Sequence, residues 1–550
     1  MSENTQTGMT MNQAEDLVMS ILRRNNIPLR APSSGATPDV PAPEDIDTGN
    51  RKRIFKGIKQ VTYEEYTNLT EEERKQYMFF VRESADAAFG FVGIGNLKYT
   101  MVPEDIRGLD CGYFDCPVPE EPDYLTFTNL GSADTFIGLK TTNFIRAQDY
   151  RPTIYYSLDD GETWVDWWAV NSPDTTQMEA RYSDIPLAPG QSVKMYGDNP
   201  NGFGTLYEPL YTSFVINDGV PVSASGNVMT LVSIDEPLDI PAVGCFQYLF
   251  GMDCQNLVSA PSLPATGLTS CCYDSMFMRC SSLENAPVLP ATELAEHCYN
   301  NMFYGCTSLR DAPVLPATVM VLGCYYGMFY GCTALTGAPV LHSTSLAATC
   351  YTDLFRECSS LVTGPGLPAE VLYSNCYRSM FYKCTSLTGL TGDFVARSFP
   401  ENSASYMFYQ CTALRSIPSL VVEETTGWQC CSYMFAYSGI ETPPVLASTN
   451  LSDECYAYMF LQCRSLVAAP ELPAQELVSN CYCNMFEGCL ALNWIKCLAT
   501  DISDYHCTYQ WVRLLGNTGT FVKADDMNDW VVGSVDGIPA GWTVINESEE

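Results

Sequence analysis

Cysteine and histidine supply many of the nucleophiles and metal ligands in proteins, and this chain has 25 cysteines but only three histidines. Most of the cysteines form pairs eight residues apart, as in Cys298 and Cys306. Zinc sites use closer C-x-x-C pairs with histidine partners, which this spacing lacks. We therefore expect the paired cysteines to be small buried apolar groups, with disulfides within or between units as the open alternative. The sequence predicts neither a metal nor another cofactor.

The three histidines give little support for acid–base catalysis. His297 and His342 lie in repeated segments, and His506 adjoins Cys507 without thereby forming a nucleophile–base pair. The chain contains no G-x-S-x-G, P-loop, H-E-x-x-H or dinucleotide fingerprint. We expect a non-enzymatic protein. A glycan-processing enzyme stays open because a pair of catalytic carboxylates carries no local signature.

The paired cysteines mark an internal repeat of about 26 residues, which predicts a solenoid. One such unit is too small to enclose a core, whereas a stack buries a continuous one. Within a unit we expect a strand around Leu309–Leu315 and a compact arc around Cys298–Cys306. Ten units follow from three columns: leading Cys at 245, 272, 298, 324, 350, 376, 430, 455 and 481, with Ser403; second Cys at 254, 280, 306, 332, 358, 384, 411, 463 and 489, with Ser438; and one Phe per unit from Phe250 to Phe486.

The residue that follows each repeated Phe varies from unit to unit, which predicts that it faces solvent. Tyrosine and arginine dominate this position, and both are favoured at recognition surfaces because they offer large contact areas at low entropic cost. A structural tyrosine column without a ligand is the alternative. The predicted ligand-binding residues are Tyr304, Tyr330, Arg356, Tyr382 and Tyr409, and Leu461 continues the same column.

Residues 122–235 read as an all-β module, with short β-prone runs between turn residues. Asp160-Gly161 is a strong hairpin signal. The surrounding Ser157–Trp164 segment resembles an Asp-box, S-x-D-x-G-x-x-W, which in sialidases and other proteins stabilises a hairpin. A β-sandwich (Ig-like) is expected here. The runs expected as strands include Leu125–Phe127, Thr153–Tyr156, Trp164–Trp168, Ser192–Met195 and Val228–Val232.

The whole chain is expected to be an α+β multidomain protein, with a β-sandwich and a small N-terminal docking region before the leucine-rich-repeat-like solenoid. The α part is an amphipathic helix at Met11–Asn25. The expected divisions are 1–50 (helix and proline-rich linker), 51–118 (docking and oligomerisation), 119–240 (β-sandwich), 241–498 (repeats) and 499–550 (C-terminal cap, with a decayed eleventh unit at Cys507–Val512).

The formal charge of −35 with only 17% charged residues describes an acidic surface without charged blocks. Such a surface repels phosphate, so neither nucleic acid nor an anionic membrane is an expected partner. The sequence lacks an N-terminal signal peptide and a run of about 20 apolar residues. We therefore expect synthesis in the cytosol and no membrane insertion.

Several motifs resemble known families. The F-x-x-C-x-x-L motif at Phe303–Leu309 and the A-P-x-L-P-A-T motif at Ala312–Thr318 resemble BspA-like leucine-rich repeats of gut bacterial surface proteins and their phages. The segments Gly519–Lys523 and Gly537–Val544 look like the closing part of such proteins. The segment Val61–Arg74 resembles N-terminal segments of phage fibre proteins.

These resemblances imply a function in adhesion. They imply a bacteriophage virion fibre or appendage, on head or tail, that binds a bacterial surface receptor, either glycan or protein. It would contact other virion proteins through its N-terminal region, form a homotrimer, and leave the host cytoplasm on lysis. A bacterial cell-surface adhesin of the same repeat family is the alternative.

Overall fold

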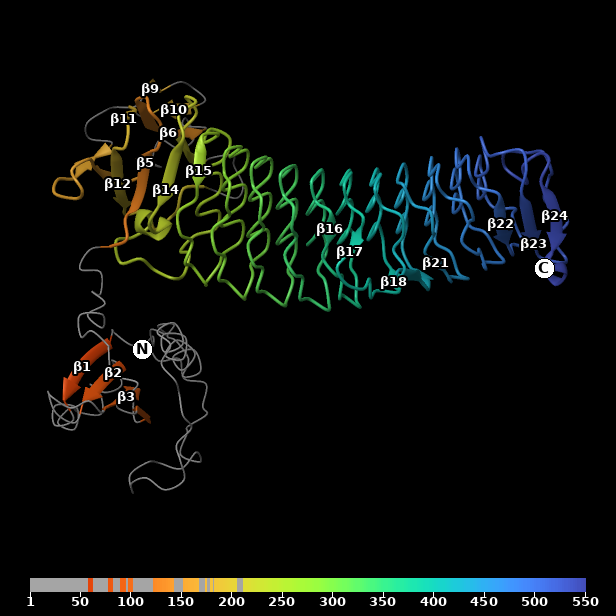
Figure 1. The fold of residues 1–550 in the computed structure, drawn as a ribbon, viewed down its shortest axis with the longest axis horizontal. Helices are drawn as coiled ribbons and strands as arrows, with labels where there is room; N and C mark the ends of the chain where they lie inside the picture. The colour runs from red at the N-terminus through yellow and green to blue at the C-terminus, as the bar shows by residue number, and fades with distance from the viewer. Residues whose placement is uncertain are drawn as a thin grey trace, which may run out of the picture. The chain divides into compact units, whose positions relative to one another are not determined.

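A computed structural model describes residues 122–142, 152–167, 183–204 and 211–550, together with the backbone of six short strands elsewhere. The chain forms two compact units, Met1–Glu121 and Pro122–Glu550 (Figure 1). The boundary predicted from the sequence at 118/119 lies within a few residues of this division, and the one at 50/51 stays a prediction. The boundary predicted at 240/241 is a change of architecture inside the second unit.

The N-terminal unit contains a four-stranded sheet in the order β1-β2-β3-β4. β1 runs parallel to β2, and the later pairs are antiparallel. The apolar runs Met78–Arg82 and Gly90–Ile94 form β2 and β3. The helix expected at Met11–Asn25 lies outside the described residues, so the α+β class remains a prediction. The strands are β1 Ile58–Thr62, β2 Met78–Arg82, β3 Gly90–Ile94 and β4 Leu97–Met101.

The second unit begins with two sheets. One has the order β11-β6-β10-β9 with β13 also paired to β6, and the other has the order β15-β14-β5-β12-β7-β8. The strands are β5 Leu125–Asn129, β6 Thr135–Thr142, β7 Ile154–Ser157, β8 Val165–Asp166, β9 Asp174–Thr175, β10 Glu179–Arg181, β11 Ile185–Leu187, β12 Ser192–Gly197, β13 Thr212–Val215, β14 Val222–Ser225 and β15 Leu257–Ser259.

A shared core connects these two sheets. Phe127 on β5 and Phe214 on β13 contact each other with ring centroids 4.9 Å apart, and both are fully buried. The Ig-like sandwich arrangement itself remains a prediction. One expected strand is wrong: Val228–Leu231 forms the 3-10 helix η3, because the Asn227 side chain accepts a hydrogen bond from the Met229 N–H and caps a helical turn.

The β module covers the first turn of the solenoid and shares its core. The Phe214 ring stacks on Phe250 at 5.4 Å, and the Phe214 N–H donates to the Leu249 carbonyl. β14 also pairs in parallel with β15, which belongs to the first repeat. The module therefore buries an end that a solenoid would otherwise expose to water.

The solenoid of stacked turns of about 26 residues is confirmed (Figure 1). One side, here called the turn face, consists of the segment from the residue before each leading Cys to the second Cys, such as His297–Cys306. Along this segment every second N–H donates to the next unit, and the N–H groups between them donate three residues back within their own unit. Examples are Tyr299 N to Cys324 O at 3.0 Å, Phe303 N to Met328 O at 2.9 Å, and Tyr304 N to Asn301 O at 3.0 Å.

Three residues per unit on the turn face have positive φ, four residues apart. In one unit these are His297, Asn301 and Gly305, with φ of 55°, 50° and 72°. Most units place residues other than glycine at these positions, although the left-handed region is unfavourable for them. The repeated interunit hydrogen bonds hold the backbone in that conformation.

Columns of identical side chains fill the interior. The Phe rings from Phe250 to Phe486 stack unit on unit, with centroids 5.3 to 5.8 Å apart. A second aromatic column follows the leading Cys and includes Tyr299 and Tyr325, 5.7 Å apart. The positions that repeat along the sequence are thus the buried ones, as predicted.

The opposite side, here called the proline face, carries the Ala-Pro-x-Leu-Pro segments. The strand expected at Leu309–Leu315 is wrong: this segment has only isolated bridges, from Asp311 to Asn285 and to Gly337. Pro313 and Pro316 supply no N–H, so a continuous ladder cannot form. The strands β16 Thr363–Gly364, β17 Gly389–Leu390, β18 Ser398–Phe399, β19 Val421–Val422, β20 Glu424–Thr425 and β21 Val445–Leu446 are correspondingly short.

The C-terminal end is closed by a parallel sheet of β22 Trp494–Cys497, β23 Thr520–Lys523 and β24 Thr543–Asn546, followed by the 3-10 helix η4 Glu547–Glu549. The eleventh unit predicted at Cys507–Val512 is confirmed, because Tyr482 N and Phe486 N donate to the Cys507 and Trp511 carbonyls. In this register Trp511 takes the Met position and Val512 the Phe position, and the Trp511 ring lies 6.1 Å from Phe486 and stacks on Trp530 at 5.4 Å. Large indoles thus cover the last Phe of the stack.

Candidate binding surface on the turn face

The five residues predicted as a binding site lie together on the turn face. Each follows a buried Phe, so it points away from the core that the Phe enters, and each is partly exposed. The structure thus brings Tyr304, Tyr330, Arg356, Tyr382 and Tyr409 into one row along five successive units. Leu461, which continued the predicted column, is only 9% exposed and adds little to the surface.

Arg356 is held between two tyrosines. Its guanidinium carbon lies 5.2 Å from the ring centroid of Tyr330 and 4.1 Å from that of Tyr382. On either side the row continues through Tyr304, 4.5 Å from Tyr330, and Tyr409, 4.7 Å from Tyr382. A cation between ring faces gains cation–π energy of about 0.5–2 kcal/mol per contact, so the row is locally stable.

A second aromatic row was missed by the sequence analysis. Tyr406, Tyr433 and Tyr458 stack with centroids 4.6 and 4.3 Å apart. Tyr406 joins the first row through Tyr409 at 5.9 Å. All three stand two residues before a repeated Phe, a column that is visible once the units are aligned. The two rows together are here called the aromatic ridge.

The stacking decides which atoms of the ridge meet solvent. Tyr382 and Tyr409 lie nearly parallel, with 5° between their planes, and Tyr433 and Tyr458 with 6°. Parallel stacked rings cover one another's faces and leave their edges and phenol hydroxyls for a ligand. In these parallel pairs the ridge therefore offers ring edges and hydroxyls rather than open ring faces, whereas Tyr304 and Tyr330 are tilted by 51° to each other.

Basic and acidic side chains are nearly equal in number around the first row, although acidic residues predominate in the chain as a whole. Arg356 donates to Asp353 at 3.1 Å, and Lys383 pairs with Glu357 at 3.5 Å. Arg378 is exposed and makes no ion pair among the residues that the structure describes. In the first row three cations therefore face two carboxylates, a local excess of one positive charge on a chain of net charge −35, whereas Glu454 adds a negative charge near Tyr458 in the second row.

Burial shifts the acidity of this cluster. The pKa of Asp353 is raised because its burial outweighs the opposing effect of Arg356. Burial lowers the pKa of Arg356, but the hydrogen bond from Arg356 to Asp353 and the Asp353 charge more than offset this, so its net pKa is raised. Burial and the neighbouring Cys483 raise the pKa of Tyr458 to about 12. The arginine and this phenol therefore keep their protons at neutral pH.

The cysteines are structural. All 23 cysteines in the described part of the chain are free thiols, and burial raises the pKa of Cys272 and Cys376 to about 12. A thiol with so high a pKa forms little thiolate, so it is a poor nucleophile and metal ligand. No group of three His, Cys, Asp or Glu side chains suited to a metal ion occurs within the described ranges.

The second cysteine of each unit has a specific acceptor. Its Sγ donates to the carbonyl of the preceding unit's Phe, as in Cys306 to Phe277 and Cys332 to Phe303, both at 3.1 Å. The Ser438 hydroxyl, in the corresponding place, lies 3.6 Å from Cys463 Sγ. These thiols add a weak hydrogen bond between units.

The histidines form no catalytic pair among the described residues. His297 has positive φ on the turn face and lies near the buried Asp274. His506 stacks between Tyr505 and Tyr509 at 3.9 and 4.7 Å, in the eleventh unit.

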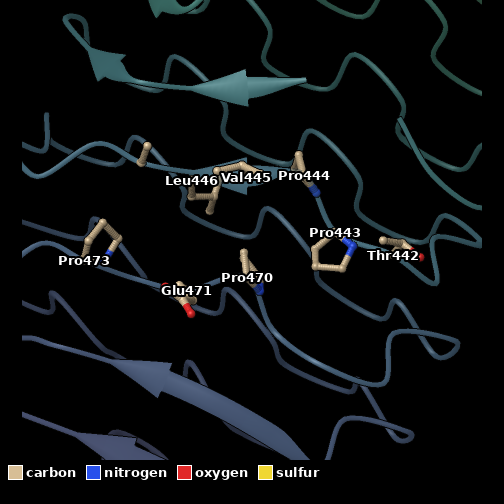
Figure 2. A pocket seen from close by; sticks show the side chains of 9 residues that line it. Thr442, Pro443, Pro444, Val445, Leu446, Pro470, Glu471 and Pro473 are labelled. Atoms are coloured by element: carbon tan, nitrogen blue, oxygen red, sulfur yellow. The ribbon is translucent and has the colours of Figure 1, made fainter. Parts of the chain in front are cut away.

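A groove of about 610 Å³ opens on the proline face between two neighbouring units (Figure 2). One wall is the segment from Thr442 to Ala447, and the other is formed by Pro470, Glu471 and Pro473. Glu471 is the only charged residue that lines it.

Among the described residues, no helix is long and apolar enough to cross a membrane. No protein-family model matches the chain, and no curated protein matches it. Among solved structures, it is similar to a leucine-rich repeat protein from Bacteroides ovatus, with 16% identity over 64% of this chain and 95% of that chain and a TM-score of 0.30.

Proposed function

We propose that this protein is a non-enzymatic binding protein whose aromatic ridge holds a receptor on the bacterial cell surface. The observation that supports the proposal is the row from Tyr304 to Tyr409, which places five large side chains side by side on an outer face. Tyrosine and arginine supply much of the energy at binding surfaces. The small positive excess around Arg378 reduces local repulsion on an otherwise acidic chain.

The geometry favours a polar, extended ligand. The ridge repeats at the spacing of the interunit ladder, about 4.8 Å per unit, so equivalent hydroxyls recur at regular intervals. A linear glycan meets such an array with many weak hydrogen bonds, whose combined affinity exceeds that of each contact. We therefore favour a surface glycan over a protein receptor.

The biological setting follows from the sequence resemblances. We place the protein in a bacteriophage virion as a fibre or appendage, with BspA-like leucine-rich repeats and a β-sandwich behind the N-terminal docking region. The separate compact unit of residues 1–121 supports a docking role for that region. A bacterial cell-surface adhesin is the second candidate, supported by the same solenoid, and a glycan-processing enzyme is the third.

Cell binding tests the proposed activity. We expect the labelled full chain to bind a subset of gut bacterial isolates saturably, and the triple variant Tyr330→Ala, Arg356→Ala, Tyr382→Ala to bind at least about tenfold more weakly. Tyr373→Ala is the matched control, since Tyr373 is 51% exposed and does not belong to the aromatic ridge. Equal binding by the triple variant and the control would remove the ridge as the site.

Particle composition tests the setting. Proteomics of purified phage particles should detect this chain, and light scattering of the full chain should report a trimer. Detection on bacterial envelopes in the absence of phage would favour the adhesin. Turnover of a surface polysaccharide would favour the enzyme.

A further inference from the structure

The groove between Val445–Ala447 and Pro470–Pro473 marks an interruption of the backbone ladder on the proline face. The unit before it bonds to its predecessor, with Val445 N to Leu420 O at 3.3 Å and Ala447 N to Val422 O at 2.8 Å. The unit after it bonds to its successor, with Leu472 N to Lys496 O at 3.0 Å. Within the described residues, no backbone hydrogen bond crosses from residues 439–451 to residues 464–478.

Proline explains the interruption. Pro443, Pro444, Pro470 and Pro473 supply no N–H, which leaves the two walls with few donors for a ladder between them. On the turn face the same two units remain bonded, for example through Phe435 N to Met459 O at 2.9 Å. The units therefore stay stacked on one side while the groove opens on the other.

The interruption leaves one edge of β21 free. Val445 and Ala447 direct their N–H groups to the preceding unit. Successive residues of a strand direct these groups to opposite sides, so the N–H and C=O of Leu446 point towards the groove. Figure 2 shows β21 facing the segment of Pro470 and Glu471 across it. A free strand edge is a template for another extended segment.

The side chains around this edge define the class of occupant. Val445 is 56% exposed, and the prolines provide apolar walls. Glu471 has a 66% exposed side chain and lies 3.9 Å from Lys496, which also contacts Glu547 and Glu550 at 3.6 and 2.8 Å. Three carboxylates share this one lysine, so a negative charge at the end of the groove lacks full compensation.

We propose that the groove binds a short, extended peptide whose backbone pairs with the free edge of β21. One apolar side chain of the peptide packs beside Val445, and a basic residue lies next to Glu471. This is strand addition, in which backbone hydrogen bonds provide affinity and alternate side chains provide specificity. The site lies on the proline face, so it is independent of the aromatic ridge and of the function proposed for it.

A labelled peptide tests the site on the full chain. The probe is a fluorescent octapeptide that alternates valine and threonine around one central lysine, and its control is the same peptide N-methylated at alternate residues. We expect the wild-type chain to bind the probe saturably and Val445→Asp to bind it about tenfold or more weakly. In Glu471→Gln, the affinity for the probe should depend less on salt concentration than in the wild type. The matched control Val314→Asp alters the corresponding position of an earlier unit, which is 74% exposed, and should leave binding unchanged.

Three results would overturn the proposal: no saturable binding by the wild-type chain, equal binding by Val445→Asp, or equal binding of the N-methylated peptide. A loss of binding in Val314→Asp would show general adhesion to exposed valines and would also overturn it. If Val445→Asp fails to fold, amide hydrogen exchange of the wild-type chain provides a second test. The bound probe should slow exchange of the Leu446 amide, and an unchanged exchange rate counts against strand addition.

Discussion

The second cysteine of each unit is explained by one contact, the Sγ hydrogen bond to a Phe carbonyl in the preceding unit. Cys358 donates to Phe329 O at 3.0 Å, whereas Cys350 in the leading column of the same unit makes no such bond. Both side chains are fully buried. The repeat spacing predicted that both columns are buried, but the partner of the second thiol depends on how neighbouring units stack.

Replacing these two cysteines separates packing from hydrogen bonding. We expect Cys358→Ala to lower the free energy of unfolding by about 1–3 kcal/mol through the lost sulfur and the lost hydrogen bond. Cys350→Ala should cost about 0.5–1 kcal/mol less, since it removes the packing alone. Chemical denaturation of both variants measures the difference, and equal losses would show that the thiol donor contributes nothing.

The Asp-box segment gives a prediction about pH. The Asp159 carboxylate accepts hydrogen bonds from the Thr163 side chain at 2.5 Å, the Thr163 N–H at 2.8 Å and the Ser157 hydroxyl at 2.7 Å. These bonds, with the Thr163 side chain contributing most, lower the pKa of Asp159 from 3.8 to about 2. The hairpin turn expected at Asp160-Gly161 is confirmed, with positive φ at both residues.

A lowered folded-state pKa stabilises the fold above the ordinary value, and this stability is lost as pH falls towards 2. We expect Asp159→Asn to destabilise the hairpin at pH 7 and to leave its stability nearly unchanged between pH 4 and 2. Amide exchange at Thr163 across this range measures the effect. A wild-type pH profile retained in the variant would assign the dependence to another carboxylate.

At the scale of elements, the sequence periodicity predicted a stack of repeated units but not the backbone conformation within each unit. The repeated Phe and Cys fixed the phase of the buried positions, because a solenoid buries equivalent residues of every unit. The run of left-handed residues on the turn face could not be predicted, since His297, Glu357 and Lys383 do not favour positive φ on their own. Interunit hydrogen bonds impose that conformation, and they exist only in the assembled stack.

The β module is expected to be necessary for the solenoid. Deleting residues 122–244 would expose Phe250 and Leu249, which Phe214 now covers, and would leave the first turn without its hydrogen-bonding partners. We expect residues 245–550 to aggregate, while residues 122–550 give a monodisperse protein with one cooperative transition. Size-exclusion chromatography and thermal denaturation compare the two. A stable, monodisperse 245–550 fragment would show that the cap is dispensable.

At the scale of the whole molecule, the sequence identified most residues of the candidate site but not how their rings are arranged. The variable column after each Phe identified Tyr304, Tyr330, Arg356, Tyr382 and Tyr409, and the structure brings these five together. Tyr406, Tyr433 and Tyr458 were missed because only one variable column was considered. The stacking of ring on ring follows from the interunit spacing, so the parallel arrangement of these rings could not be inferred from residue types.

The tyrosine hydroxyls distinguish two functions of the ridge. A ridge that only stabilises the stack depends on its rings, whereas a ridge that binds a polar ligand also depends on its hydroxyls. The substitutions Tyr304→Phe, Tyr330→Phe, Tyr382→Phe and Tyr409→Phe together keep the rings and their stacking but remove four phenol oxygens. Tyr373→Phe is the matched control outside the ridge. The two proteins should therefore unfold at similar temperatures, with a small loss in the fourfold variant from the hydrogen bond between Tyr330 and Arg356.

The most direct measurement is the affinity of the fourfold phenylalanine variant for bacterial cells that the wild-type chain binds. The ridge model predicts a loss of about tenfold or more, since unpaired hydrogen-bonding groups of the ligand each cost about 1 kcal/mol or more. Tyr373→Phe should bind like the wild type. Undiminished binding by the fourfold variant would contradict the model and leave the tyrosines as a structural column.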